Sequence, residues 1–305
     1  MDEYADISRI CDPLVSKCQM NTISLALLQE YRRQTFRTTL DLRLKTIEEA
    51  VAFVNERGFI FFWPIQGITL PSLWSAVAGD RPVANAHDDP GHVTWGWKDT
   101  LLGSRQWYYA KILRRKATMV AFEMLPFFYA LSENYGSLEE DYLVLYQMGR
   151  MTQEAKSIYE ALLEEAPLDT IALRKKARMT SQSSESRFNR ALSDLQADFK
   201  ILPVAVTQSG AWRYAFAYDI VARHYPELDE RTRSIQEKTA RQELARRYFQ
   251  SVGAARIEDL RKLFGWRLAS VEAAVDTLVE EGYLRRGLTL EQNRAEMIAI
   301  AALAG

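Results

Sequence analysis

Residues 181–217 constrain the fold more than any other stretch of the sequence. The first half carries an apolar stripe at helical spacing, because its members recur in steps of three and four residues. The stripe consists of Phe188, Ala191, Leu192, Leu195 and Phe199. Two β-like runs follow, at 201–206 and 212–216, with a Gly-containing turn at 207–210 between them. A helix, a strand, a turn and a returning strand in about 35 residues predict a winged helix-turn-helix unit.

Polar and basic side chains surround this stripe. The face opposite the stripe carries Ser183, Ser186 and Arg190, with Arg187 on its flank and Arg213 in the returning strand. Lys175 and Lys176 come from the preceding helix, predicted over 167–179. Such a set favours DNA binding, with cations on phosphates and the helix in a groove. The alternative is a protein-docking or purely structural unit whose charged face is solvated and pairs with the acidic residues of 154–169.

The length of 305 residues favours two domains or three small ones. An acidic linker at 137–141 marks one boundary. We expect an N-terminal winged-helix-like domain with an aromatic and basic insertion (1–136), a central winged helix (137–225), and a C-terminal winged helix with a tail helix (226–305). The predicted fold class is mainly α with small β-wings, built from tandem winged helix-turn-helix units.

Composition and motifs exclude several classes of protein. With 48% hydrophobic and 26% charged residues the chain is typical of an ordinary soluble protein. No apolar run approaches the roughly 18 residues of a membrane span, and the acidic N-terminus lacks the layout of a signal peptide, so we expect a cytoplasmic protein without a membrane partner. Cys11 and Cys18 indicate two reduced thiols, and the loop at 87–92 is ordinary turn chemistry. Neither indicates a metal site, and the sequence gives no reason to invoke a cofactor.

Helix signals recur along the rest of the chain. We predict helices at 22–36, capped by Asn21 or Thr22; at 46–57, ended by Gly58; and at 154–163, capped by Thr152. The apolar stretch 119–131 predicts a buried helix interrupted by Pro126. The alanine-rich tail, 291–305, predicts a last helix.

An unusual concentration of aromatic and basic residues occupies 94–116. It contains Trp95, Trp97, Lys98, Arg105, Trp107, Arg114 and Arg115. One interpretation is a groove in which aromatic rings stack on bases and cations hold phosphates. The other is a domain core whose large rings are covered by long basic side chains. The sequence leaves both open.

Residues 240–287 predict another winged helix, whose third helix (269–281) is acidic on its exposed side. That side carries Glu272, Asp276, Glu280 and Glu281. Because an acidic helix repels phosphate, we expect this unit to pack on its neighbours or to bind a protein partner, with Arg285 and Arg286 of the wing still able to touch a DNA backbone.

A family resemblance begins at the apolar run 59–67, which follows Gly58 and contains Pro64-Ile65, with Leu73-Trp74 beyond it. This layout is similar to the AlkZ/YcaQ winged-helix DNA glycosylases, which excise alkylated bases, including those of interstrand crosslinks. The stretches 248–253, 257–260 and 264–266 look like the last winged helix of that family. The similarity spans about residues 22–285 and implies tandem winged helices that bind double-stranded DNA, possibly damaged.

One departure from the family pattern bears on catalysis. The family carries a Gln-x-Gln or Gln-x-Asp motif directly before Pro-Ile, and here Phe61 and Trp63 stand at its two polar positions. Base excision needs a polar group to position water and to stabilise the cationic sugar, which neither residue supplies. The resemblance therefore implies a relative without the family's chemistry. A relocated catalytic set would draw on Gln66, Asp99 and Glu123.

Three functions remain open at this point. The first is a DNA-binding protein related to the alkylation-repair glycosylases that lacks their chemistry. The second is an active glycosylase, hydrolysing an N-glycosidic bond with relocated residues. The third is a transcriptional regulator or a protein-binding winged-helix scaffold.

Overall fold

The computed structural model describes residues 22–210, 212–291 and 293–304. The thiols Cys11 and Cys18 and the short leader predicted over 1–20 lie outside the described residues. The described chain is mainly helical with small sheets, as the sequence predicts.

One order of elements occurs three times in the described chain: a helix, a short strand, two helices and a pair of strands. The first unit contains α3 (Ile47–Arg57), β2 (Phe59–Phe61), α4 (Leu73–Ala78), α5 (Val93–Thr100), β3 (Tyr108–Lys111) and β4 (Ala117–Val120). The second contains α8 (Gln153–Glu164), β5 (Leu168–Asp169), α9 (Thr170–Lys176), α10 (Glu185–Ala197), β6 (Ile201–Thr207) and β7 (Ala215–Ile220). The third contains α13 (Glu237–Val252), β8 (Ala254–Ala255), α14 (Ile257–Phe264), α15 (Leu268–Glu280), β9 (Leu284–Leu290) and β10 (Asn293–Ile300).

Strand pairing repeats with the same order. In each unit the last strand lies between the other two, giving the sheets β2-β4-β3, β5-β7-β6 and β9-β10-β8, with antiparallel pairs throughout. β1 (Thr22–Ile23) extends the third sheet by pairing parallel to β9. The chain thus builds one small α/β architecture repeatedly.

The remaining elements connect these units. They are α2 (Leu25–Thr35), η1 (Pro90–His92), η2 (Leu113–Arg115), α6 (Leu125–Tyr129), α7 (Asp141–Gln147), η3 (Gln182–Ser184), α11 (Val221–His224), α12 (Glu227–Thr232) and η4 (Ala301–Leu303).

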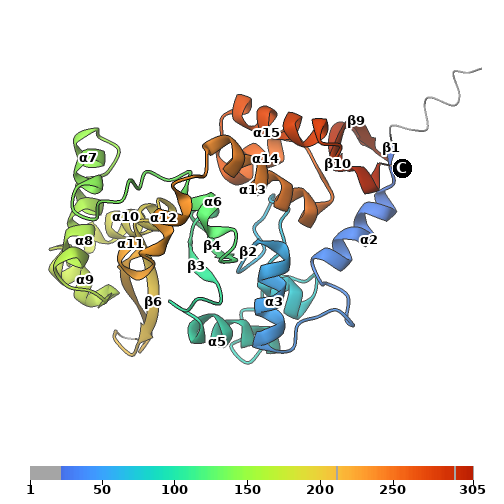
Figure 1. Cartoon of the computed structure of the whole chain (residues 1–305). Coiled ribbons are helices and arrows are strands. Elements are labelled where there is room, and N and C mark those ends of the chain that lie inside the picture. Colours follow the sequence, from blue (N-terminus) through green and yellow to red (C-terminus); the bar gives the residue numbers. More distant parts are fainter. Residues whose placement is uncertain (1–21, 211, 292, 305) are drawn as a thin grey trace, which may run out of the picture.

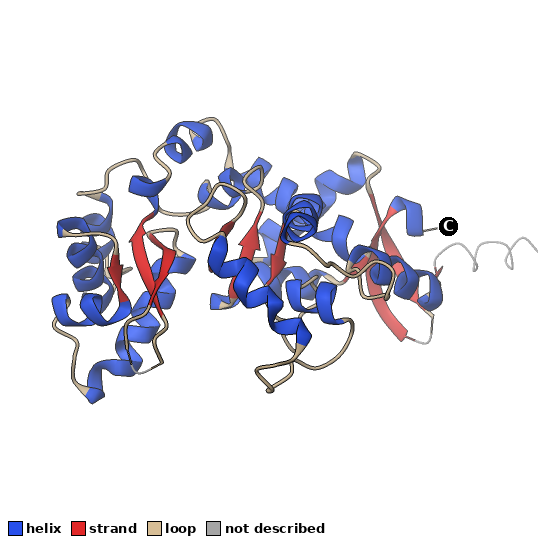
Figure 2. Ribbon diagram, turned by 90° about the horizontal axis from the view of Figure 1, so that it is seen from below, coloured by secondary structure: helices blue, strands red, loops and turns tan. Residues whose placement is uncertain are grey.

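The order of the units in space differs from their order in the sequence. Figure 2 shows the sheets in a row, with the first unit's sheet in the middle and the sheets of the second and third units on either side. In Figure 1 the chain runs from the third unit's side (blue, α2), through the centre (β2, β4), to α7–α10 and back (orange). Buried residues of the first and third units share one core, whereas most of the second unit's buried residues form another.

Local signals explain the confirmed helix ends. Thr46 accepts a hydrogen bond from the Glu49 amide at 3.2 Å, and the Glu49 carboxylate accepts from the Thr46 amide, which forms a capping box at the start of α3. Gly58 ends that helix with φ 79°, a conformation that costs glycine little. Thr152 caps α8 by accepting from the Ala155 amide at 3.2 Å.

Several predicted elements were wrong. The described part of the alanine-rich tail is the strand β10 followed by the short 3-10 helix η4 rather than one α-helix, because pairing with β9 and β8 outweighs the helix propensity of alanine. The stretch 119–131 is the end of β4 followed by α6, with Pro126 in the first helical turn, where its missing N–H costs nothing.

Two more predicted boundaries need correction. The helix predicted over 22–36 begins only at Leu25, because Thr22 and Ile23 pair with β9. The returning strand predicted at 212–216 begins only at Ala215. Trp212 therefore belongs to the turn between β6 and β7.

Candidate nucleic-acid interface

Phe61 and Trp63, which the family resemblance aligns with a polar catalytic pair, lie among other aromatic side chains in this structure. Phe61 ends β2, its backbone pairs with Thr118 of β4, and its side chain is fully buried. Trp63 stacks on Trp74, with ring centroids 5.6 Å apart and planes 9° apart, and Trp95 meets it edge-on at 5.8 Å. These rings leave no polar group at either position to activate water.

The neighbouring loop at 80–92 is held by its own polar groups. Arg81 donates to the Asp89 carboxylate at 2.6 Å and, with the Gly91 amide, lowers the pKa of Asp89. His92 makes a hydrogen bond between Nε2 and the Ala84 carbonyl at 3.0 Å. Within the described ranges, no three histidine, cysteine, aspartate or glutamate side chains gather as a metal site would require.

The three candidate catalytic residues are not brought together. Gln66 is exposed in the loop between β2 and α4, and Glu123 is exposed in the turn before α6. Asp99, on α5, is instead part of a buried polar cluster with Lys98 and Tyr214. No hydrogen bond or ion pair among the described residues joins Gln66 or Glu123 to Asp99.

Lys98 is the centre of that polar cluster. Only 1% of this residue is exposed, and its Nζ donates to the Tyr214 hydroxyl at 2.7 Å and lies 2.7 Å from Asp99 Oδ1. Tyr214 in turn donates to Asp99 Oδ1 at 2.9 Å. Five rings surround the ammonium group at 4.6–5.6 Å from their centroids, those of Phe62, Trp95, Tyr109, Tyr214 and Phe216.

The Lys98 cluster joins the first unit to the second, because Lys98 and Asp99 lie on α5 and Tyr214 directly precedes β7. Burial lowers the pKa of Lys98, and contact with Asp99 partly offsets this effect. Burial together with the hydrogen bond to Asp99 raises the pKa of Tyr214. Each polar group has a partner and the rings supply a cation–π environment, so the cluster serves as a connection between units.

The aromatic and basic block thus divides into core and surface. Trp107 is buried, with 1% exposed, and Trp97 is half-buried, whereas 38% of Trp95 is exposed. The surface cations are Arg105, paired with Glu227, Arg115, paired with Asp194, and Arg114, which has no acidic partner among the described residues.

The second unit presents a more continuous basic surface. On α10, Ser186, Arg187 and Arg190 are exposed, while Phe188 and Ala191 face the core, as the stripe predicts. Arg187 lies 3.4 Å from Glu154, and Arg190 has no ion pair with any described residue. We call the exposed residues of this surface the basic face: Lys175, Arg178, Ser183, Ser186, Arg187, Arg190 and Arg213.

Lys176, which the sequence predicts to contact DNA with these residues, is not part of the basic face. Its ammonium group is 2.7 Å from Glu165 and 3.3 Å from Glu164, so its charge is largely balanced by α8. Arg174 is turned inward, donating to the Met179 and Ser181 carbonyls and lying over the Phe188 ring. Four cations of the basic face have no ion pair with a described residue: Lys175 on α9, Arg178 just after it, Arg190 on α10 and Arg213 in the hairpin.

The sequence prediction missed Trp212, which is 92% exposed at the turn between β6 and β7. The sequence pattern places Trp212 at the start of the predicted returning strand, 212–216. Its position two residues after Gly210, inside a turn, was the signal that pointed to the surface instead.

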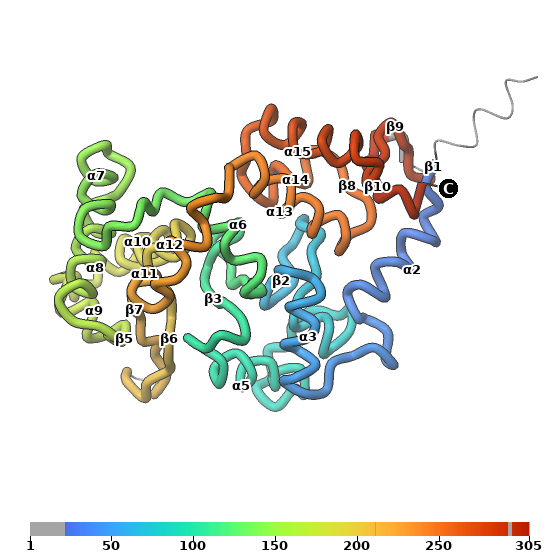
Figure 3. Tube along the Cα trace, in the orientation of Figure 1, coloured from blue at the N-terminus to red at the C-terminus, as the bar shows by residue number. Residues whose placement is uncertain are grey.

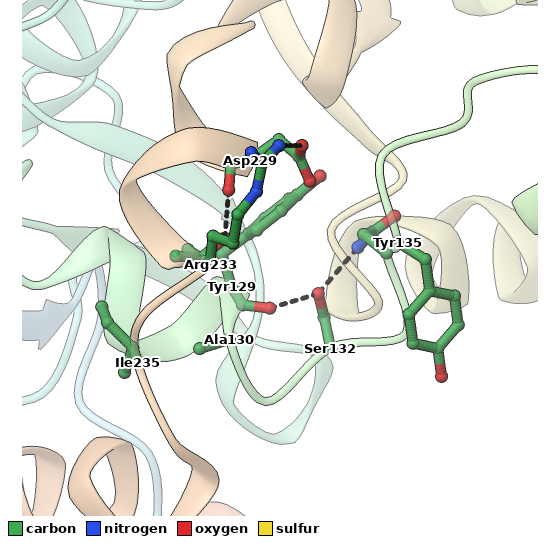
Figure 4. A pocket seen from close by; sticks show the side chains of 9 residues that line it. Tyr129, Ala130, Ser132, Tyr135, Asp229, Arg233 and Ile235 are labelled. Carbon is green, nitrogen blue, oxygen red and sulfur yellow. Dashed lines mark hydrogen bonds and ion pairs between the residues drawn. The ribbon is translucent and has the colours of Figure 1, made fainter.

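A separate hollow of about 300 Å³ lies where the chain passes between units. Figure 4 shows it between residues 129–135, which leave the first unit, and α12 with the residues after it. Asp229 and Arg233 form an ion pair at 3.4 Å on one side, and Ser132 donates to the Tyr129 carbonyl at 2.6 Å on the other. These polar groups satisfy each other, and the hollow contains none of the candidate catalytic residues.

Every described helix is too short or too polar to cross a membrane.

Comparisons with known proteins agree with this architecture. A family model described as "AlkZ related" matches residues 44–265, which is more than half of the chain. The DNA glycosylase AlkZ of Streptomyces sahachiroi has a similar structure, with a TM-score of 0.56 and 11% sequence identity over 92% of this chain and 71% of that one. No curated protein matches the sequence. The chain belongs to the AlkZ-related family.

Proposed function

We propose that this protein binds double-stranded DNA through tandem winged helices and does not excise bases by the mechanism of the AlkZ glycosylases. The proposal rests on the apolar pair Phe61 and Trp63, which the family resemblance aligns with the catalytic polar positions. The chain belongs to the AlkZ-related family and is similar in structure to a DNA glycosylase. Phe61 is fully buried and Trp63, which is half-buried, stacks on Trp74, so neither side chain offers a carboxylate or an amide to a water molecule or a sugar.

The repeated element order supports the winged-helix interpretation. A winged helix places its third helix in a groove of DNA and its hairpin beside the backbone. In the second unit these elements are α10 and the β6–β7 hairpin. We propose the domain boundaries 1–136, 137–225 and 226–305 on the same grounds, although the first and third units share a core.

The third helix of the second unit and that of the third unit differ in the charge that they expose. The basic face belongs to the second unit, whose third helix presents Arg187 and Arg190. In the third unit, α15 exposes Glu272 and Asp276; Asp276 pairs with Arg286 of the wing at 2.8 Å, so this unit presents no excess of positive charge to phosphate. We therefore assign the main DNA contact to the second unit, with phosphates held by arginine and the groove met by Ser183 and Ser186.

The alternative of relocated chemistry rests on Asp99 alone. Gln66 and Glu123 lie exposed and apart from it, whereas Asp99 lies near the aromatic rings that surround Trp63. Its carboxylate is occupied by Lys98 and Tyr214, which argues against a free general base. A scaffold that binds protein remains the third alternative.

One experiment separates these functions. Binding and base release are measured on a labelled duplex with a single alkylated purine, beside an undamaged control, with protein in excess. We expect binding that weakens steeply with salt and no released base. Base release that Asp99→Asn abolishes would establish the relocated enzyme, and absence of binding at low salt would favour the protein scaffold.

Charge variants locate the interface. Changing Arg187 and Arg190 together to Ala removes about two phosphate contacts, so the slope of log K against log salt falls by roughly 2 in magnitude. The matched control changes Arg33 and Lys238, two exposed cations on α2 and α13, to Ala. An equal effect of both double variants would contradict an interface on the second unit.

A further inference from the structure

The hairpin between β6 and β7 ends in an aromatic tip that has no partner in the molecule. We define the hairpin tip as Gly210, Trp212 and Arg213. Trp212 is 92% exposed, and no described residue makes a ring contact or hydrogen bond with its side chain. Because burying a tryptophan is strongly favourable, one held in water at a protruding turn suggests a ligand surface. Figure 1 shows this hairpin (gold) extending away from α8–α10.

The residues on either side of the hairpin tip, Ser209 and Tyr214, are both hydrogen-bonded to other parts of the chain. On one side Ser209 donates to the Asp169 carboxylate at 2.6 Å, and Asp169 also caps α9 by accepting from the Ile171 and Ala172 amides. On the other side Tyr214 is fixed by the Lys98 cluster described above. These contacts fix the residues that flank the hairpin tip, from which the Trp212 side chain projects into solvent.

The turn itself is tight and strained. The Arg213 amide donates to the Gly210 carbonyl at 3.1 Å, which brings the two ends of the hairpin tip together. Arg213 adopts φ 48°, a left-handed conformation that arginine rarely takes. Such strain persists where the surrounding structure imposes it, and it is concentrated at functional sites.

The composition of the hairpin tip indicates the kind of ligand. Its apolar neighbour is Ile171, 49% exposed, whose Cδ1 would lie 3.1 Å from a Cβ on Gly210. The apolar area that Trp212 and the half-exposed Ile171 offer is too small for a stable protein interface, which buries about 1,200–2,000 Å². A base step, in contrast, needs only one flat ring to stack on and a cation for the adjoining phosphate, which Trp212 and Arg213 supply.

We propose that Trp212 inserts into a base step of duplex DNA and makes the protein selective for duplexes in which that step is already unstacked, as beside an abasic site or a mismatch. This inference rests on the DNA binding proposed above. Opening an intact step costs stacking energy, whereas an abasic site leaves a gap that the indole fills. Arg213 holds the phosphate at the edge of that gap.

The test compares affinities for two duplexes of the same sequence, one intact and one with a single tetrahydrofuran abasic analogue flanked by 2-aminopurine. We expect the full-length protein to prefer the abasic duplex and to quench 2-aminopurine fluorescence. Trp212→Ala should reduce the preference roughly 5- to 150-fold, the range of one base-stacking contact, and abolish the quenching, while Trp212→Phe retains most of both.

The matched control is Tyr135→Ala, which removes an aromatic side chain, 70% exposed, outside the hairpin. It should leave preference and quenching as they are. An unchanged preference in folded Trp212→Ala overturns the inference while the proposed DNA binding stands, and a Trp212 that serves a protein partner gives that result. Failure of the wild-type protein to bind either duplex at low salt overturns both proposals.

Discussion

At the scale of single residues, His224 links stability to pH. Its Nε2 makes a hydrogen bond with the Gly103 carbonyl at 2.7 Å, and its Nδ1 lies 3.8 Å from Asp219. Both partners are acceptors, so Asp219, together with the Gly103 carbonyl, raises the pKa of His224 against the opposing effects of burial and Arg105. A raised folded pKa means stabilisation that is complete below the unfolded value of about 6.5 and is lost as pH rises through the folded value.

We therefore expect the free energy of unfolding of the wild-type protein, relative to His224→Gln, to decrease as pH rises from about 6.5. Denaturant unfolding at several pH values measures this difference. His87→Gln, a change of an exposed histidine in the loop before α5, is the control. A difference that stays constant, or grows with pH, would contradict the assigned role of Asp219.

At the scale of elements, the Lys98 cluster fixes α5 against the β6–β7 hairpin. Lys98→Met leaves the Asp99 carboxylate and the Tyr214 hydroxyl without their cation, so we expect a loss of about 2–4 kcal/mol in stability. Tyr214→Phe should cost about 1–2 kcal/mol. Because the two side chains share one network, the double variant should lose less than the sum of the singles, as measured by denaturant unfolding. Strict additivity would show that they act independently, and Thr100→Ala, on the exposed side of α5, is the control.

Some element boundaries can be predicted from the sequence, and others cannot. The caps at Thr46 and Thr152 and the end at Gly58 are local signals, and the structure confirms them. The tail strand was missed because its partners β9 and β8 decide its conformation, which alanine content does not reveal. That Phe61 and Trp63 are apolar, unlike the polar residues of the family pattern, can be seen from the sequence alone. The burial of Lys98 cannot be seen there, because its hydroxyl partner Tyr214 is 116 residues away.

At the scale of the whole molecule, the second unit has a largely separate core. Its buried residues, from Tyr142 to Ile220, form one cluster, whereas the first and third units share another. Four buried apolar residues of the segment 137–225 pack into the shared core instead: Phe199, Leu202, Val221 and Tyr225. A folding domain needs its own buried core, and this second-unit cluster supplies one within the proposed domain 137–225.

We expect a fragment of residues 137–225 to fold alone, with helical circular dichroism and a cooperative thermal transition. It should be less stable than the same unit in the full chain, because Phe199 and Leu202 become exposed and the Lys98 cluster loses α5. Phe199→Ser should raise the solubility of the fragment but destabilise the full-length protein, since the residue is 4% exposed there.

If the fragment is folded, its DNA binding can be measured directly. Salt-dependent binding that Arg187→Ala together with Arg190→Ala weakens would place the interface within this unit. A fragment with no cooperative transition would mean that the unit depends on its neighbours and that the domain boundary is wrong.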